Sequence, residues 1–361
     1  MRFAAKWVSV YICLLLLASC ASKEPPIYQL ISLYQQKKYD EAIAFAEKLT
    51  AKNPDDSQAY RFIVRSVIDK NPAEAGKDLD KFKEKYGQLA QKNPNVAGYH
   101  FALGYIDTQL KNTDSAIAEL QKAIQLNPNI EYAHYVLGWV YLNSDSAGGD
   151  VEKALAEWSK EEQLNPKSLG ALQVYADRAT HYLKTGNADA AVKDYEKITV
   201  YAFAQDDITG ARTQISKIHA LQDELAKAEA DAKNKPDDAE ANYKLGVAQY
   251  GNGMRKDAIQ TWQKAAKLDP DNAELHNYLG KALFEDKQYD DAIKHLQKAV
   301  ELDSKMTMAY YNLAVAEDVS GQPKKALEHY KKYVELNPAA DDTVKQRIST
   351  LEEETVPKKE G

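Results

Sequence analysis

The side chains best suited to chemistry are seven histidines, and their spacing contains no catalytic or metal-binding motif. No two histidines stand at metal-ligand spacing beside a carboxylate, and no His-Glu-x-x-His, Walker or Gly-x-Ser-x-Gly motif occurs. Gly251-x-Gly253 follows a predicted helix rather than a strand, which indicates a turn and not a nucleotide-binding loop. Asp145 and Asp150 lack the spacing of a calcium-binding loop. The sequence therefore predicts a protein that is not an enzyme and holds no metal or cofactor.

The chemistry that the sequence does indicate lies at Cys20, near the N-terminus. Arg2 and Lys6 precede an apolar run that is shorter than the roughly 20 residues of a membrane-spanning helix. The run ends in Leu17-Ala18-Ser19-Cys20, which resembles a bacterial lipobox. In that motif lipid is attached to the cysteine thiol, and the chain is cut just before the cysteine. An ordinary secretory signal, with Cys20 incidental, is the alternative.

The lipobox resemblance implies a signal peptide over residues 1–19 and a lipidated cysteine with a short tether over 20–26. It also implies that the chain reaches a membrane through its lipid and lies in the cell envelope. Because no Asp follows Cys20, the pattern resembles outer-membrane sorting in a Gram-negative cell. The mature protein would then face the periplasm.

A 34-residue repeat organises the rest of the chain. Pro94 and Pro128 are one repeat apart, and so are Pro236 and Pro270. Small residues keep the same step, namely Gly104 and Gly138; Gly246, Gly280 and Ala314; and Ala258, Ala292 and Ala326. Proline ends one helix, and the Asp or Asn beside it can cap the next. The small residues let two helices approach closely, so each repeat is predicted to be a helix pair.

These residues resemble the tetratricopeptide repeat (TPR). The best copy has Leu245-Gly246, Ala258, Trp262, Ala265 and Pro270 where that family expects them. The resemblance implies an all-α fold, an α-α superhelical solenoid of about eight helix pairs. The copies are 23–56, 57–96, 97–130, 131–168, 169–203, 239–272, 273–306 and 307–340. They form an N-terminal block over 27–203 and a C-terminal block over 239–340, and copies 23–56, 57–96 and 169–203 are degenerate.

Two segments depart from the repeat. Residues 204–238 lack a break between helices, and their apolar residues keep helical spacing, which predicts one long linking helix. Residues 341–361 are charged with few apolar positions, which is typical of a capping helix and tail at the open end of a solenoid.

In the TPR family, positions 2, 5, 9, 12 and 13 of each repeat line a concave groove. The resemblance therefore implies a peptide-binding surface rich in aromatic rings, which are common in binding hot spots. Its predicted residues are Phe101, Tyr105, Tyr132, Tyr135, Trp139 and Gln173, with Asn277 and Lys281 in the C-terminal block. The same rings could equally serve to pack neighbouring repeats.

The charge balance argues against nucleic acid as the partner. Asp and Glu number 54 against 47 Lys and Arg, the formal net charge is −7, and no basic tract occurs. The leading hypothesis is a lipid-anchored adaptor or scaffold of the cell envelope, which binds a protein or peptide segment in its groove and assists assembly of an envelope complex. The alternative is a self-associating structural protein, with two copies paired through a surface such as the linking helix.

Overall fold

The computed structural model describes residues 26–144, 149–202 and 204–355, which form eighteen helices and no strand. The predicted signal peptide, Cys20 and nearly all of the tether lie outside the described residues, as does the centre of the turn that contains Asp145. The chain divides into two compact units. One comprises Met1–Thr180 and Val192–Thr213, and the other His181–Ala191 and Gln214–Gly361.

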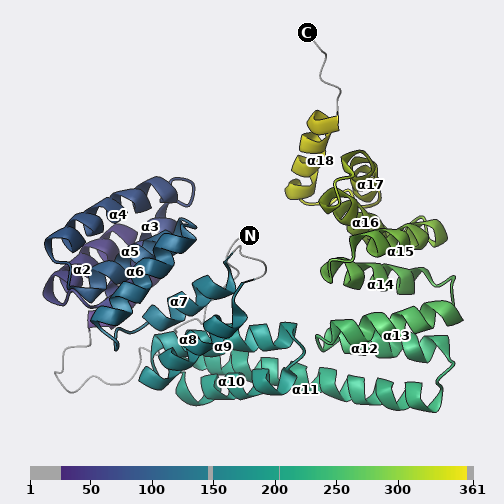
Figure 1. Cartoon of the computed structure of the whole chain (residues 1–361), viewed down its shortest axis with the longest axis horizontal. Helices are drawn as coiled ribbons and strands as arrows, with labels where there is room; N and C mark the ends of the chain where they lie inside the picture. The colour runs from purple at the N-terminus through teal and green to yellow at the C-terminus, as the bar shows by residue number, and fades with distance from the viewer. Residues whose placement is uncertain (1–25, 145–148, 203, 356–361) are drawn as a thin grey trace, which may run out of the picture. The chain divides into compact units, whose positions relative to one another are not determined.

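The first unit is a row of helix pairs (Figure 1). Its helices are α1 (Pro26–Gln35), α2 (Tyr39–Lys52), α3 (Ser57–Lys70), α4 (Ala75–Lys92), α5 (Ala97–Gln109), α6 (Thr113–Leu126), α7 (Ala133–Leu142) and α8 (Val151–Leu164). Residues of α9 (Leu169–Lys184), α10 (Ala188–Tyr201) and the 30-residue α11 (Gln205–Asn234) are divided between the two units.

The first helices of successive pairs pack on one another in this unit. Helix α3 contacts α1 and α5, and α5 contacts α7, whereas no two second helices make comparable contact among the described residues. In a curved stack the closer row lies on the inner side. Helices α1, α3, α5 and α7 therefore form the inner surface of the first unit.

Glycines at the predicted repeat positions set the spacing within each pair. A Cβ on Gly104 would lie 2.7 Å from Leu120 Cγ, and one on Gly280 would lie 2.6 Å from Leu296 Cγ. Gly138 faces Trp158 in the same way, although the turn between them is longer. A larger side chain at any of these positions would push the two helices apart.

The fourth residue of several repeats ties the preceding loop to the pair. Each donates a hydrogen bond to the carbonyl oxygen of the proline six residues earlier. The bonds run from Tyr60 to Pro54 (3.0 Å), His100 to Pro94 (3.1 Å), Asn242 to Pro236 (2.9 Å) and His276 to Pro270 (3.0 Å). The two histidines are thus placed in packing and loop-fixing positions.

The second unit repeats the same construction with α12 (Ala239–Gly251), α13 (Arg255–Leu268), α14 (Ala273–Glu285), α15 (Tyr289–Leu302), α16 (Thr307–Val319), α17 (Pro323–Leu336) and α18 (Asp342–Thr355). Helix α18 packs on α17 through the buried Val344 and Leu351, as a capping helix must. The predicted fold class is confirmed: an all-α solenoid of eight helix pairs with one long helix and a C-terminal cap.

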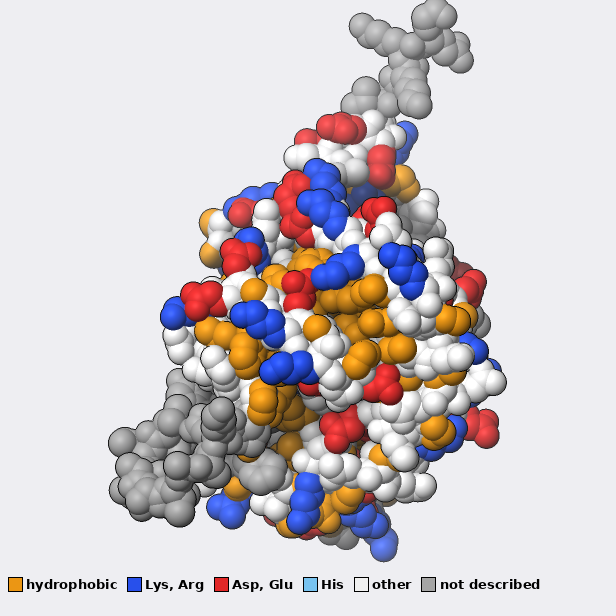
Figure 2. Space-filling view, turned by 90° about the vertical axis from the view of Figure 1, so that its left-hand side faces the viewer, with side chains coloured by type: hydrophobic (Ala, Val, Ile, Leu, Met, Phe, Trp, Pro, Cys, Tyr) orange, Lys and Arg blue, Asp and Glu red, His pale blue; other side chains and the backbone are white. Residues whose placement is uncertain are grey.

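The surface shown in Figure 2 carries charged and hydrophobic side chains side by side. On the face drawn in Figure 2, acidic and basic side chains are interspersed around hydrophobic ones rather than gathered by sign. No helix in the described part of the chain has both the length and the apolarity to cross a membrane.

Candidate functional site on the inner surface of the first unit

The structure divides the predicted groove residues by burial. Phe101 is fully buried, and Tyr132 and Tyr105 are 4% and 6% exposed, so these rings pack mainly within the unit. Tyr135, Trp139 and Gln173 are half-buried. That the groove residues contact a ligand stays a prediction. Among those of the first unit, Tyr135, Trp139 and Gln173 have the most exposed side chains, so they are the ones best placed to make that contact.

The aromatic rings form a continuous row across the inner helices. The ring centroids of Phe101 and Tyr105 are 5.9 Å apart, those of Tyr105 and Tyr132 6.3 Å, and those of Tyr132 and Tyr135 4.7 Å. The row ends in polar groups on α9. The Tyr135 hydroxyl donates to Asp177 Oδ2 (2.8 Å), and Gln173 Nε2 donates to Asp177 Oδ1 (3.3 Å).

A buried carboxylate on α8 holds the start of α7, and with it two of these rings. Glu161, 1% exposed, accepts hydrogen bonds from the backbone N–H groups of Tyr132 (2.8 Å) and Tyr135 (3.3 Å). Tyr132 has a φ of 71°, a left-handed conformation that costs energy for a residue other than glycine. The hydrogen bond from its N–H helps to hold that conformation, so Glu161 is a positioning residue for the row.

Burial raises the pKa of Glu161 to about 6, against an ordinary value of 4.5, although its backbone hydrogen bonds oppose the rise. The folded chain then binds this proton more tightly than the unfolded chain. The contribution of Glu161 to stability is therefore largest below pH 4.5, and falls by about 2 kcal/mol as the pH rises through 6.

Glu161→Gln should remove this pH dependence. Relative to wild type, the unfolding free energy of the variant should rise by about 2 kcal/mol between pH 4 and pH 7.5, measured by urea unfolding. Glu152→Gln changes the charge of an exposed residue on the same helix and serves as the control. A difference between Glu161→Gln and wild type that does not vary with pH would contradict this assignment.

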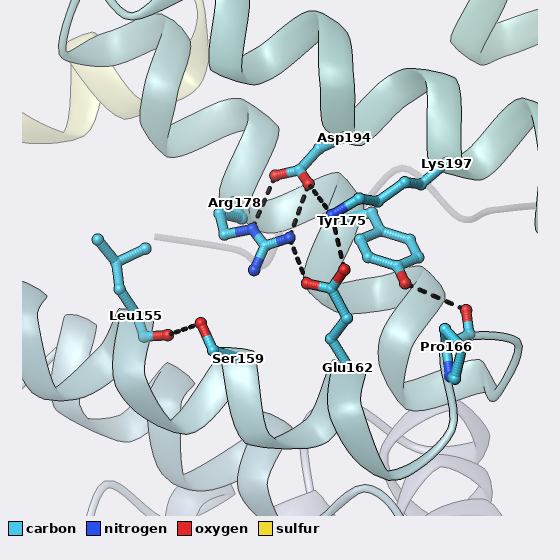
Figure 3. Close-up of polar contacts among 8 residues, drawn as sticks. All are labelled: Leu155, Ser159, Glu162, Pro166, Tyr175, Arg178, Asp194 and Lys197. Carbon is cyan, nitrogen blue, oxygen red and sulfur yellow. Dashed lines mark hydrogen bonds and ion pairs between the residues drawn. The ribbon is translucent and has the colours of Figure 1, made fainter.

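A buried ion network fixes α9 against its neighbours (Figure 3). Arg178 donates to both carboxylate oxygens of Asp194 on α10 (2.8 and 2.7 Å) and to Glu162 on α8 (2.8 Å). Lys197 also donates to Glu162 (2.6 Å). Although burial alone would raise the pKa of Glu162, hydrogen bonds from Lys197 and Arg178 hold it below its ordinary value. Because Arg178 follows Asp177 in the chain, the network orients the polar end of the row.

Sequence reasoning missed two arginines on α3. Arg61 and Arg65 stand at positions 5 and 9 of copy 57–96, the positions that Tyr135 and Trp139 occupy in copy 131–168. The Arg61 guanidinium lies over the Tyr132 ring, with Cζ 4.7 Å from the centroid. Both arginines stand at groove positions of the repeat, but this copy is degenerate, so the family pattern marks those positions only weakly.

The two predicted residues of the second unit lie near each other on α14. Asn277 accepts a hydrogen bond from Asn312 on α16 (3.0 Å). Lys281 lies over the Tyr250 ring, with Nζ 5.4 Å from its centroid. Within the described residues, no group of three His, Cys, Asp or Glu side chains could hold a metal ion.

Comparison with known proteins finds three matching family models. Two are described as tetratricopeptide repeat, over residues 243–307 and 283–345, and one as TPR repeat, over 104–145. None of the curated proteins compared matches the chain.

Several solved structures are similar over part of their length. The crystal structure of MamA is 26% identical, covering 49% of this chain and 83% of that one, with a TM-score of 0.33. The Arabidopsis OM64 TPR domain is 23% identical, covering 32% and 94%, with a TM-score of 0.30. The Cut9-Hcn1 hetero-tetramer of APC/C is 15% identical, covering 90% and 55%, with a TM-score of 0.41.

Proposed function

We propose that this chain, which matches tetratricopeptide repeat models over residues 104–145 and 243–345, is an adaptor that binds a segment of a protein partner on the inner surface of its first unit. One observation carries this proposal: Tyr135 and Trp139 are half-buried one turn apart on α7, and Tyr135 donates a hydrogen bond to Asp177 of the Gln173–Asp177 pair on α9. Such rings offer large contact area at small entropic cost, and the polar pair can hydrogen-bond a peptide backbone.

The positions of these groups are held before any partner arrives. Glu161 holds the start of α7, and Arg178 ties α9 to α8 and α10. Binding then requires little ordering of the site, which favours affinity. This rigidity supports a recognition surface rather than a row of rings that only fills space.

We place the adaptor at a membrane through lipid on Cys20, in the cell envelope. On this proposal it assists assembly of an envelope complex, from an outer membrane facing the periplasm if the cell is Gram-negative. The support is the Leu17-Ala18-Ser19-Cys20 sequence after an apolar run. Stable anchoring needs more than one acyl chain, which modification of both the thiol and the new N-terminus would supply.

Cys20→Ser is expected to move the protein from the membrane to the soluble fraction. The reason is that acyl chains contribute about 0.8 kcal/mol per buried CH₂ and the serine variant would carry none. Fractionation of cells, followed by blotting for the protein, makes the measurement. Retention of Cys20→Ser in the membrane fraction would sink the lipid-anchor proposal.

The binding function is tested by capture from envelope extract with the soluble chain that begins at residue 21. Tyr135→Ala/Trp139→Ala should reduce the captured partner at least tenfold, because both anchor rings are gone. Tyr141→Ala is the matched control, since Tyr141 lies on the same helix but accepts a hydrogen bond from Gln121 on α6. Circular dichroism establishes that each variant is folded.

If the double variant still captured the partner, the binding site would not lie on the inner surface. Recovery of this chain alone, with sedimentation as a dimer, would favour the self-associating structural protein instead.

A further inference from the structure

Three hydrogen-bond donors near α3 lack an acceptor in the described part of the chain. Gln58 Nε2 and Arg61 Nε are buried without a partner, and the hydroxyl of Tyr132 makes no hydrogen bond there. The three groups are neighbours. Gln58 Oε1 accepts from Arg61 (3.4 Å), and the Arg61 guanidinium lies over the Tyr132 ring. All belong to the first unit.

Other arginines of the described chain form ion pairs with carboxylates, and Arg61 does not. Arg178 is paired with Asp194 and Glu162, and Arg347 with Asp318 and Glu354. No carboxylate among the described residues forms an ion pair with the half-buried Arg61. Removing a cation from water without an anion beside it is costly, and the cost is recovered when an anion arrives.

From this geometry we infer that Gln58, Arg61 and Tyr132 form a binding position for an acidic side chain of the partner segment. The inference rests on the proposed function and adds the chemical class of the partner. A carboxylate accepts several hydrogen bonds at once, and a guanidinium suits it best.

The surrounding charges favour an anion here. Arg65, one turn further along α3, is a second cation near Tyr132. The charged side chains that act on Tyr132 are two arginines, Arg61 and Arg65, against one carboxylate, Asp177, so positive charge is in excess around it. Burial raises the pKa of Tyr132, against the opposing charges of Arg61 and Arg65, so its hydroxyl remains a neutral donor.

We assign the bound carboxylate to an Asp or Glu side chain within the partner segment, rather than to the C-terminal carboxylate of the partner. Helix α3 packs against α1 on one side and α5 on the other, so the inner surface continues in both directions past Arg61. A segment that also reaches Tyr135 and Trp139 must extend beyond the anion position. An acidic side chain within an extended segment fits that path.

The test uses three labelled peptides and fluorescence anisotropy with the soluble chain. They are acetyl-Gly-Gly-Glu-Gly-Glu-Gly-Gly-amide, its Gln counterpart, and the Gln counterpart with a free C-terminal carboxylate. Wild type should bind the Glu peptide at least tenfold more tightly than either Gln peptide. Arg61→Gln should lose this preference, and Arg61→Lys should keep part of it, because the charge remains without the planar fork.

Lys92→Gln, an equal change of charge at an exposed residue of α4, should alter the affinity less than twofold. In ¹⁵N spectra the Arg61 Nε–H resonance should shift on adding the Glu peptide, which reports on this side chain directly. Thermal unfolding checks that the variants are folded.

Equal binding of the Glu and Gln peptides, absence of binding, or an equal loss in Lys92→Gln would each overturn the inference. Tighter binding of the free C-terminal carboxylate would overturn the assignment to an internal side chain. None of these results bears on the proposed function, because capture through Tyr135 and Trp139 is measured separately.

Discussion

Replacing Arg178 by methionine is expected to destabilise the first unit by about 3–5 kcal/mol, the usual cost of breaking a buried ion pair by removing one partner. Asp194, whose side chain is 3% exposed, would retain only Lys197 at 3.6 Å. The loss should appear in urea unfolding and as faster hydrogen exchange in α8, α9 and α10. It should also weaken partner capture, because α9 carries Gln173 and Asp177.

Two further variants separate the charge from the packing. Arg178→Met/Asp194→Leu removes both buried charges and should recover most of the lost stability. Arg347→Met removes a comparable pair whose arginine is 36% exposed, and should cost about 1 kcal/mol or less. If Arg178→Met lowered the free energy of unfolding no more than Arg347→Met does, the Arg178 ion network would not be what fixes α9 against α8 and α10.

Gly98→Ala is expected to cost about 3 kcal/mol or more, an unusually large effect for one added methyl group. A Cβ on Gly98 would overlap the carbonyl oxygen of Pro54 and lie 2.9 Å from Tyr60 Cε2. Neither the Pro54 carbonyl nor the Tyr60 ring can move away easily to make room for the methyl group. The Tyr60 hydroxyl is bonded to that same carbonyl, and Asp55 accepts from the Gly98 N–H (2.9 Å).

Gly87→Ala on α4 is the matched control for this change. No heavy atom lies within 4 Å of a Cβ added there, so alanine should stabilise the helix by about 0.5–1 kcal/mol. Both changes are measured by urea unfolding followed by circular dichroism. A Gly98→Ala protein as stable as wild type would mean that α5 does not pack against the loop at Pro54 as described.

Much of the fold could be predicted because its signals recur along the chain. Gly104 and Gly280 indicated close helix contact, and in the structure each faces a leucine of its own pair. The unbroken helical spacing after residue 204 predicted the long helix α11. Local caps were predicted less well. The repeat pattern predicts that the Asp beside a proline caps the next helix, but after Pro54 it is the second residue, Asp56, that caps α3. Asp55, directly after Pro54, instead accepts hydrogen bonds from the Gly98 N–H and from Asn127.

The site was harder to predict because it depends on contacts between repeats. The family pattern implied that Phe101 and Tyr132 line the groove, but burial is decided by neighbouring rings and gives the exposed role to Tyr135 and Trp139. The Arg178–Asp194 pair joins residues 16 apart with no motif to mark it. The left-handed Tyr132 likewise has no sequence signal, since it is held by Glu161 from another helix.

The central claim is that a partner segment lies against the inner surface of the first unit. Site-specific photo-crosslinking in cells tests it most directly, with benzoylphenylalanine placed either at Gln173, next to Asp177 and Tyr135 at the edge of the inner surface, or at Lys122, exposed on the second helix α6. We predict a crosslinked partner from position 173 that is absent from position 122 and is lost in Tyr135→Ala/Trp139→Ala. A partner that crosslinks from position 122 and not from 173 would contradict the account.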